Sequence, residues 1–316
     1  MKFSTFMMSN DDKQKLLELQ NEFKFLNPNV LRALYARGLR DKDSIKEFFT
    51  CSIESVRLNK EFTNGETLVE KLSKCWEIIV IAGDYDCDGI CGTSVAYLGL
   101  RELGYDVGYY LNSRDIGYGL KPQSVDEILL RFPNVKVILT VDNGITANEG
   151  IEYANSKGIR VFVTDHHKQD GDLPNAEVIV NPNQDCCTSE FKGNCGAAVI
   201  WKVIRDLAIH KKNEKALTSI NDLLDLVAIA TIADQVPLLD DNRTMVKIGF
   251  KLLNRRSRFS IDRLLTVAGQ DNIEEESVGY YIAPLINAIN RLELDCNDVV
   301  RMLTADYDDK AFIDEF

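Results

Sequence analysis

Acidic residues follow directly on short apolar segments in three places of the sequence. The segment IIVIAG (78–83) precedes a D-x-D-x-D run, VKVILTV (135–141) precedes an aspartate, and VFVT (161–164) precedes Asp-His-His. The polar residues concerned are Asp84, Asp86, Asp88, Asp142, Asp165, His166 and His167. Three like charges at alternate positions repel one another unless a cation neutralises them. Carboxylates with one or two imidazoles suit Mn²⁺ or Mg²⁺ better than zinc, so the pattern predicts a divalent-metal site.

Parts of this pattern also have simpler interpretations. A single aspartate after a strand is usually a turn or helix-cap residue, and two adjacent histidines can lie at the surface without a ligand. A calcium loop of the EF-hand type is excluded, because its twelfth position counted from Asp84 is Val95 instead of glutamate. Adjacent histidines cannot both reach one metal ion from the same strand face. One of His166 and His167 would therefore bind metal, and the other would face the substrate.

The elements that must position these residues are those of an α/β fold. Two more apolar runs and three amphipathic stretches occur in the same region, at 107–112, 177–181, 93–103, 123–132 and 147–157. Short apolar runs that alternate with amphipathic stretches are typical of a parallel β-sheet flanked by helices. The carboxyl ends of parallel strands meet at one edge, where such folds place their sites. The aspartates are therefore expected to converge.

Three regions are predicted along the chain. Residues 77–253 are expected to form the α/β core, and residues 1–76 a helical N-terminal segment packed on it, because leucines recur there at helical spacing. Residues 254–316 are expected to form a mainly helical C-terminal extension. The stretch 251–263 is rich in basic residues and contains Phe259, which fits either a path for a nucleic-acid strand or a solvated helix face.

Composition narrows the class of protein. No run approaches the roughly 18 apolar residues of a membrane-spanning helix, and the N-terminus has no secretory pattern, so a soluble cytoplasmic protein without a membrane partner is predicted. The eight cysteines have no C-x-x-C pair, which disfavours zinc, and reduced thiols are expected. Glycine-rich nucleotide motifs and a G-x-S-x-G elbow are absent from the sequence. The net charge of −12 disfavours a simple phosphate-binding protein.

Four ordered segments resemble a known family. GDYDCDG (83–89), VDNG (141–144), TDHH (164–167) and TIADQVPL (231–238) resemble the motifs of the DHH phosphoesterases, and most closely those of the RecJ-type single-strand-specific DNA exonucleases. Shorter segments support that branch: LYARGL (34–39), NSRDIGYGL (112–120), VNPN (180–183), DNR (241–243) and INAINRL (286–292). The resemblance implies a DHH phosphoesterase core and two bound divalent cations, Mn²⁺ or Mg²⁺.

The resemblance also implies roles for particular residues. Asp142 would bridge the two cations, Asp84 would be a ligand or would orient one, and His167 would contact the scissile phosphate. The implied metal ligands are Asp84, Asp86, Asp88, Asp142, His166 and Asp234. The implied catalytic residues are Asp142 and His167, and the implied substrate-binding residues are Arg114, Tyr118, Asn183 and Arg291. For Tyr118 an ordinary turn after a strand is an equal alternative.

The sequence departs from the family pattern in two respects. Where such enzymes read N-A-A-G-R, this chain has N-A-I-N-R at 287–291. It also ends where the family continues into a DHHA1 domain, often followed by an OB-fold. It is expected to be a fragment, a naturally minimal form, or a chain whose substrate-binding domain comes from a separate protein.

The implied function is metal-dependent hydrolysis of single-stranded DNA by an exonuclease, in the 5′ to 3′ direction, in DNA repair or recombination. One alternative is a DHH phosphodiesterase acting on short oligonucleotides or cyclic dinucleotides. Another is a catalytically silent, replication-associated binding module. Two divalent cations would change the net charge from −12 to −8 and reverse the sign of the field at the site, so the acidity fits a metal-dependent enzyme.

Overall fold

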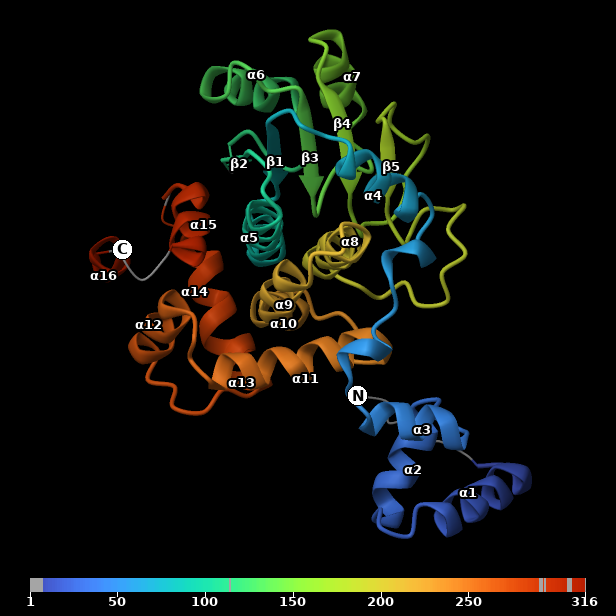
Figure 1. The fold of residues 1–316 in the computed structure, drawn as a ribbon. Helices are drawn as coiled ribbons and strands as arrows, with labels where there is room; N and C mark the ends of the chain where they lie inside the picture. Colours follow the sequence, from blue (N-terminus) through green and yellow to red (C-terminus); the bar gives the residue numbers. More distant parts are fainter. Residues whose placement is uncertain (1–7, 114, 290–291, 293, 306–308, 316) are drawn as a thin grey trace. The chain divides into compact units, whose positions relative to one another are not determined.

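The computed structural model describes residues 8–113, 115–289, 292, 294–305 and 309–315. The chain divides into two compact units, Met1–Ser52 and Ile53–Phe316. The first unit contains α1 (Asn10–Glu22), α2 (Pro28–Ala36) and α3 (Lys42–Phe49), which enclose a small core of their own (Figure 1). The side chains of Ser9, Asn27 and Asp41 cap these helices, so their starts are encoded locally. This division into compact units does not test the domain boundaries predicted at residues 76 and 253, which stay predictions.

The second unit is built on a five-stranded parallel sheet, as predicted. Its strands are β1 (Ile79–Gly83), β2 (Val107–Leu111), β3 (Val137–Val141), β4 (Arg160–Thr164) and β5 (Val178–Val180), in the order β2-β1-β3-β4-β5. Ile79 pairs with Val107 on one side and with Val137 on the other. The strand order reverses at the β1–β3 boundary, which is the position where open α/β sheets bind ligands.

Helices cover both faces of the sheet. Alternate strand residues enter two separate cores: Val80 and Ile138 pack with α6 (Pro122–Arg131) and α7 (Asn148–Ser156), while Ile81 and Leu139 face α5 (Cys87–Glu102) and α8 (Gly196–His210). This double burial explains why the strands read as continuous apolar runs. The short helix α4 (Gly65–Ser73) packs against α8 and β5. In the chain it follows two short 3₁₀ turns, η1 (Ile53–Ser55) and η2 (Asn59–Glu61).

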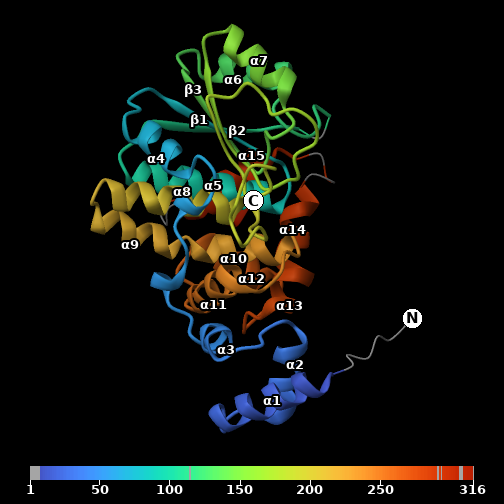
Figure 2. The same ribbon diagram turned by 90° about the vertical axis from the view of Figure 1, so that its right-hand side faces the viewer.

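A further layer of helices lies on the side of α5 and α8 that faces away from the sheet (Figures 1 and 2). It begins with α9 (Glu214–Asp222), α10 (Leu224–Ala233) and α11 (Asp240–Asn254). The chain continues through α12 (Phe259–Val267), α13 (Glu275–Ser277), the π-helical turn η3 (Val278–Ile282), α14 (Ala283–Ala288), α15 (Cys296–Thr304) and α16 (Lys310–Glu315). Residues Glu214–Ala233 are long and apolar enough to cross a membrane, but 61% of their most apolar window is buried inside the fold. The burial is typical of core helices.

A buried carboxylate of α8 gives the fold a pH dependence that can be measured. Asp206 Oδ2 accepts a hydrogen bond from the Asn59 backbone N–H (2.7 Å), whereas its Oδ1 is buried without a hydrogen-bond partner. Burial raises the pKa of Asp206 to about 6. The fold therefore favours the protonated form of Asp206. This contribution to stability is fully present below about pH 4 and is lost as the pH rises through about 6. Between pH 4 and 7 the free energy of unfolding should fall by up to about 2 kcal/mol more in the wild type than in Asp206→Asn, measured by urea denaturation. Parallel curves for the two proteins would contradict this assignment.

Candidate metal centre

The predicted ligands converge at the carboxyl edge of the sheet. Asp84 follows β1, Asp142 follows β3, and Asp165 to His167 follow β4, so the strand ends bring these segments together. The D-x-D-x-D run forms the start of α5: Asp86 is the N-cap residue, and its Oδ1 accepts the Gly89 N–H at 3.0 Å. Asp234 does not follow a strand: it is the residue that ends helix α10.

Asp142 lies in an unusual backbone conformation. Its φ is +62°, in the left-handed region that residues other than glycine seldom adopt. A Cβ on Gly196 at the start of α8 would lie 2.5 Å from Asp142 Cβ and 2.6 Å from its Oδ1. Asp142 therefore reaches its position only because residue 196 has no side chain. Backbone strain of this kind is concentrated at functional sites.

Asp88 is fixed by the N-terminus of α8. Its Oδ2 accepts a hydrogen bond from the Gly196 N–H at 2.6 Å, and its Oδ1 accepts one from the Ala197 N–H at 2.8 Å. Free N–H groups at a helix N-terminus favour a negative charge, so Asp88 stays oriented despite its acidic neighbours. The two carboxylates Asp88 and Asp142 thus share α8 as a support.

The side chains form three overlapping groups that could hold metal ions. Within each group, one ligand atom per residue lies within 4.8 Å of the others: Asp84, Asp86 and Asp142; Asp88, His166 and Asp234; and Asp142, His166 and His167. His166 Nε2 is central, at 3.0 Å from Asp142 Oδ1, 3.6 Å from Asp88 Oδ2 and 3.8 Å from Asp234 Oδ2. Asp142 and His166 each belong to two of the three groups, and of these two side chains only the Asp142 carboxylate has two oxygens that could bridge two ions.

The electrostatics of the site fit bound cations. Burial, together with neighbouring carboxylates, raises the pKa of Asp84 to about 7 and that of Asp234 to about 6, and it raises the pKa of Asp86 and Asp142 as well. Among the described residues, the buried Oδ1 atoms of Asp84 and Asp142 receive no hydrogen bond. Buried carboxylate oxygens normally have a partner. Unpartnered oxygens beside an imidazole match the donor set that Mn²⁺ and Mg²⁺ prefer.

Asp165 is a positioning residue rather than part of the three groups. Its Oδ1 accepts the His166 N–H (2.7 Å) and the His167 N–H (3.0 Å) and lies 2.8 Å from His167 Nδ1, while its Oδ2 accepts the Ile145 N–H (2.8 Å). Burial opposes ionisation of Asp165, but the hydrogen bonds from His167 and Ile145 lower its pKa overall. Asp165 therefore holds the two histidines as a charged acceptor.

His167 lies at the open side of the site. Its side chain is 44% exposed, against 13% for His166, and the Tyr118 hydroxyl lies 2.9 Å from its Nδ1. Burial lowers the pKa of His167, but Asp165 outweighs burial and raises the pKa overall. Tyr118 Oη also donates to the Asp142 carbonyl at 3.4 Å, so Tyr118 joins the histidine to the β3 turn.

The hydrogen bond between Asp165 and His167 can be tested by substitution. Asp165→Asn removes the charge that orients the imidazole while it preserves the size of the side chain. For the phosphodiester hydrolysis expected from the sequence, kcat should fall by about 10- to 100-fold with little change in KM. The imidazole ring of His167 would lose its orientation but keep its contact surface. The KM and kcat values from initial rates check this expectation. An unchanged kcat would show that Asp165 does not act through His167.

Some contacts that secure the site were not predicted from the sequence. Asn181 Nδ2 donates to the His167 carbonyl at 2.8 Å, and Asn183 Nδ2 donates to the His166 carbonyl at 2.5 Å. Asn287 Oδ1 accepts the Cys87 N–H at 2.9 Å, which anchors the turn between Asp86 and Asp88. The motifs VNPN and INAINRL contained these asparagines, but nothing in the sequence showed what they contact.

Two of the four predicted substrate-binding residues, Tyr118 and Asn183, lie in the part of the chain that the structure describes. The structure places Tyr118 against His167, whereas the amide nitrogen of Asn183 is engaged by backbone carbonyls. Arg114 and Arg291 lie outside the described residues. The roles of these four residues in substrate binding stay predictions.

The fold and the site match those of a known protein family. Residues 78–231 match the model of the DHH family, N-terminal domain. The matched range contains all five strands, His167 and five of the six proposed metal ligands. The sixth ligand, Asp234, follows the range by three residues. The chain belongs to the DHH family.

Within that family the chain is similar to RecJ proteins. It is 34% identical over 282 residues to the single-stranded-DNA-specific exonuclease RecJ of Escherichia coli (strain K12), an alignment that covers 84% of this chain and 48% of that protein. It is 33% identical over 288 residues to RecJ of Bacillus subtilis (strain 168), covering 89% and 35%. The chain therefore spans half or less of the length of these two relatives.

Solved structures give the same result. The structure of RecJ from Thermus thermophilus in complex with Mn²⁺ matches with a TM-score of 0.77 and 27% identity, covering 96% of this chain and 43% of that one. A structure of exonuclease RecJ bound to manganese matches with a TM-score of 0.70 and 30% identity, covering 80% and 64%. Both matched structures contain Mn²⁺.

Proposed function

We propose that this chain carries the catalytic centre of a metal-dependent exonuclease that hydrolyses phosphodiester bonds in single-stranded DNA. The observation that carries the proposal is the convergence of Asp84, Asp86, Asp88, Asp142, His166 and Asp234 around shared ligand positions. The unpartnered oxygens of Asp84 and Asp142 support metal binding, and the names of the similar RecJ proteins support the substrate. The centre would bind two divalent cations, Mn²⁺ or Mg²⁺.

The protein's own residues would divide the work as follows. Two divalent cations, when bound, supply an activated water as the nucleophile and offset the charge on the leaving oxygen. Asp142, which belongs to two ligand groups, would hold both positions together, and α8 keeps Asp88 aimed at the same space. His167, at the open side and kept protonated more readily by Asp165, would donate a hydrogen bond to a phosphate oxygen.

Two alternatives from different classes are less well supported. A phosphodiesterase for short oligonucleotides or cyclic dinucleotides would use the same metal centre, but the similar proteins named above are exonucleases for single-stranded DNA. A catalytically silent binding module would not need a full ligand set, and here all six proposed ligands lie around the same centre. The 5′ to 3′ direction, and a role in DNA repair or recombination, are part of the proposal.

The proposal has a direct biochemical test. Single-stranded and double-stranded oligonucleotides in a graded series of lengths are incubated with the chain and Mn²⁺, with EDTA as control. We expect mononucleotides to appear from the single strands only, and label at the 5′ end to be released first. Preference for the shortest substrates would favour the oligonucleotide alternative. The absence of any hydrolysis would contradict the proposal.

The cellular setting also belongs to the proposal. We propose that the protein lies in the cytoplasm. A separate protein that supplies a substrate-binding domain stays a prediction. Co-purification with the chain, followed by a gain in DNA affinity when the partner is added back, would support it.

A further inference from the structure

The segment from α13 to α14 contacts two of the elements that carry metal ligands. η3 packs against α10, and a Cβ on Gly279 would lie in ordinary contact, 3.8 Å, with Ile232, two residues before Asp234. At the other end of the segment, Asn287 accepts the hydrogen bond from Cys87, between Asp86 and Asp88. The segment is therefore anchored to both sides of the metal centre, and α14 lies beside α10 in both views (Figures 1 and 2).

Two consecutive aromatic side chains of this segment face solvent. Tyr280 is 75% exposed and Tyr281 is 46% exposed, whereas their neighbours Val278 and Ile282 are fully buried. The segment here is π-helical, a rare conformation that often occurs at functional sites. The buried neighbours fix the backbone and hold both rings at the surface, where Tyr281 is partly covered and Tyr280 is mostly free of contacts.

We infer that Tyr280 and Tyr281 form a stacking platform for the bases of single-stranded DNA next to the metal centre. This inference rests on the proposed function and names the residues that would hold its substrate. Aromatic rings bind single strands by stacking on bases, and this interaction tolerates any sequence. Stacking also needs no positive charge, which matters for a chain with a net charge of −12. A strand stacked on η3 would lie beside α10, which ends at the proposed metal ligand Asp234.

A single strand fits this surface better than a second protein does. Gly279, the residue before Tyr280, lies against Ile232, two residues before Asp234, so an occupant of the platform would lie on the α10 side of the metal centre. The hydroxyls of both tyrosines also allow the rings to stay hydrated when no strand is bound, as is typical of amphipathic binding surfaces.

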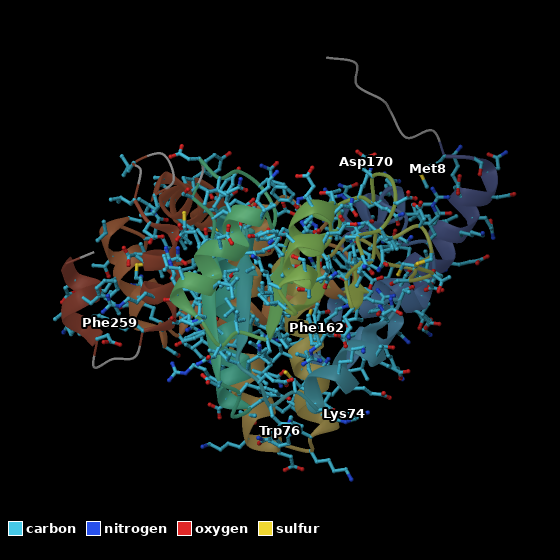
Figure 3. The ribbon with its side chains drawn as sticks, turned by 90° about the horizontal axis from the view of Figure 1, so that it is seen from above. Met8, Lys74, Trp76, Phe162, Asp170 and Phe259 are labelled. Atoms are coloured by element: carbon cyan, nitrogen blue, oxygen red, sulfur yellow. The ribbon has the colours of Figure 1, made fainter. Side chains whose placement is uncertain are left out.

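The test compares variants of the two tyrosines with a distant exposed aromatic residue. Trp76 is 87% exposed and lies three residues before β1, at the end of the sheet opposite to the loop that contains Asp170 (Figure 3). The variants are Tyr280→Ala, Tyr281→Ala, the pair Tyr280→Phe with Tyr281→Phe, and Trp76→Ala. The Kd for a phosphorothioate-linked single strand is measured in Mn²⁺, together with KM and kcat on the ordinary strand and the affinity for Mn²⁺ alone.

Each alanine substitution should raise Kd and KM by at least about fivefold, the equivalent of one lost stacking contact. The phenylalanine pair and Trp76→Ala should retain the wild-type Kd, and all variants should bind Mn²⁺ as the wild type does. Alanine variants with unchanged Kd and KM would overturn the inference, and so would a phenylalanine pair as weak as the alanine variants. A wild type that binds the strand without hydrolysing it would contradict the proposed function alone. A wild type that does not bind the strand would overturn the platform as well.

Discussion

Replacing Asp142 with asparagine is expected to reduce Mn²⁺-dependent hydrolysis by at least about 1,000-fold, the equivalent of some 4 kcal/mol of transition-state stabilisation. Asp142 belongs to the group of Asp84 and Asp86, and its Oδ1 lies 3.0 Å from Nε2 of His166, which belongs to the group of Asp88 and Asp234, so Asp142 connects the two proposed cation positions. Asparagine preserves the shape of the side chain but removes the charge. The measurement is the rate of mononucleotide release at saturating Mn²⁺.

The same variant should also lose most of the stabilisation that Mn²⁺ gives to the fold. A cation that binds only the native state raises the melting temperature to an extent set by its affinity. The matched control is Asp172→Asn, which removes an exposed carboxylate from the loop after the histidines. The control should keep wild-type activity and the wild-type response to Mn²⁺. Full activity in Asp142→Asn would refute the assignment of Asp142 as a shared ligand.

The second large effect is expected from a single methyl group. In Gly196→Ala, the added Cβ would lie within 2.6 Å of Asp142 Oδ1, which is closer than non-bonded atoms approach. Either Asp142 or the start of α8 must move, and α8 also holds Asp88. Displacing a catalytic group by about 1 Å can cost on the order of 100-fold in rate, and we expect at least that loss of activity, with weaker Mn²⁺ binding.

The glycine prediction has its own control. Gly279→Ala introduces the same methyl group into a helical segment where the nearest atom, Ile232 Cγ2, would be 3.8 Å away. It should retain the wild-type rate and affinity for Mn²⁺. Circular dichroism of both variants checks that the fold persists. A Gly196→Ala variant that is folded and as active as Gly279→Ala would show that the close approach of Asp142 to α8 is not needed.

The sequence was sufficient to predict the sheet and the convergence of most of the proposed metal ligands. Strands buried on both faces leave continuous apolar runs, and such runs ended directly before Asp84, Asp142 and Asp165. Since parallel strands end at one edge, the convergence of these residues could be predicted without coordinates. Asp234 was identified through the family resemblance alone, because it follows a helix far along the chain and no local pattern marks it.

The supports of the site could not be predicted, because they depend on contacts between distant segments. Gly196 matters only through Asp142, 54 positions earlier in the numbering, and Asn287 only through Cys87, 200 positions earlier. The left-handed backbone of Asp142 is likewise invisible in a sequence that has an ordinary aspartate there. Asp165 looked like one more acidic residue of the site, whereas its four hydrogen bonds show that it orients the histidines.

The most direct test of the central claim is to locate the cations. Crystals grown with Mn²⁺ should give an anomalous-difference map, recorded near the manganese edge, with two peaks at the carboxyl edge of the sheet. One peak should lie among Asp84, Asp86 and Asp142, the other among Asp88, His166 and Asp234, and Asp142 should contact both. An empty map at this edge, or manganese bound only elsewhere on the chain, would contradict the account.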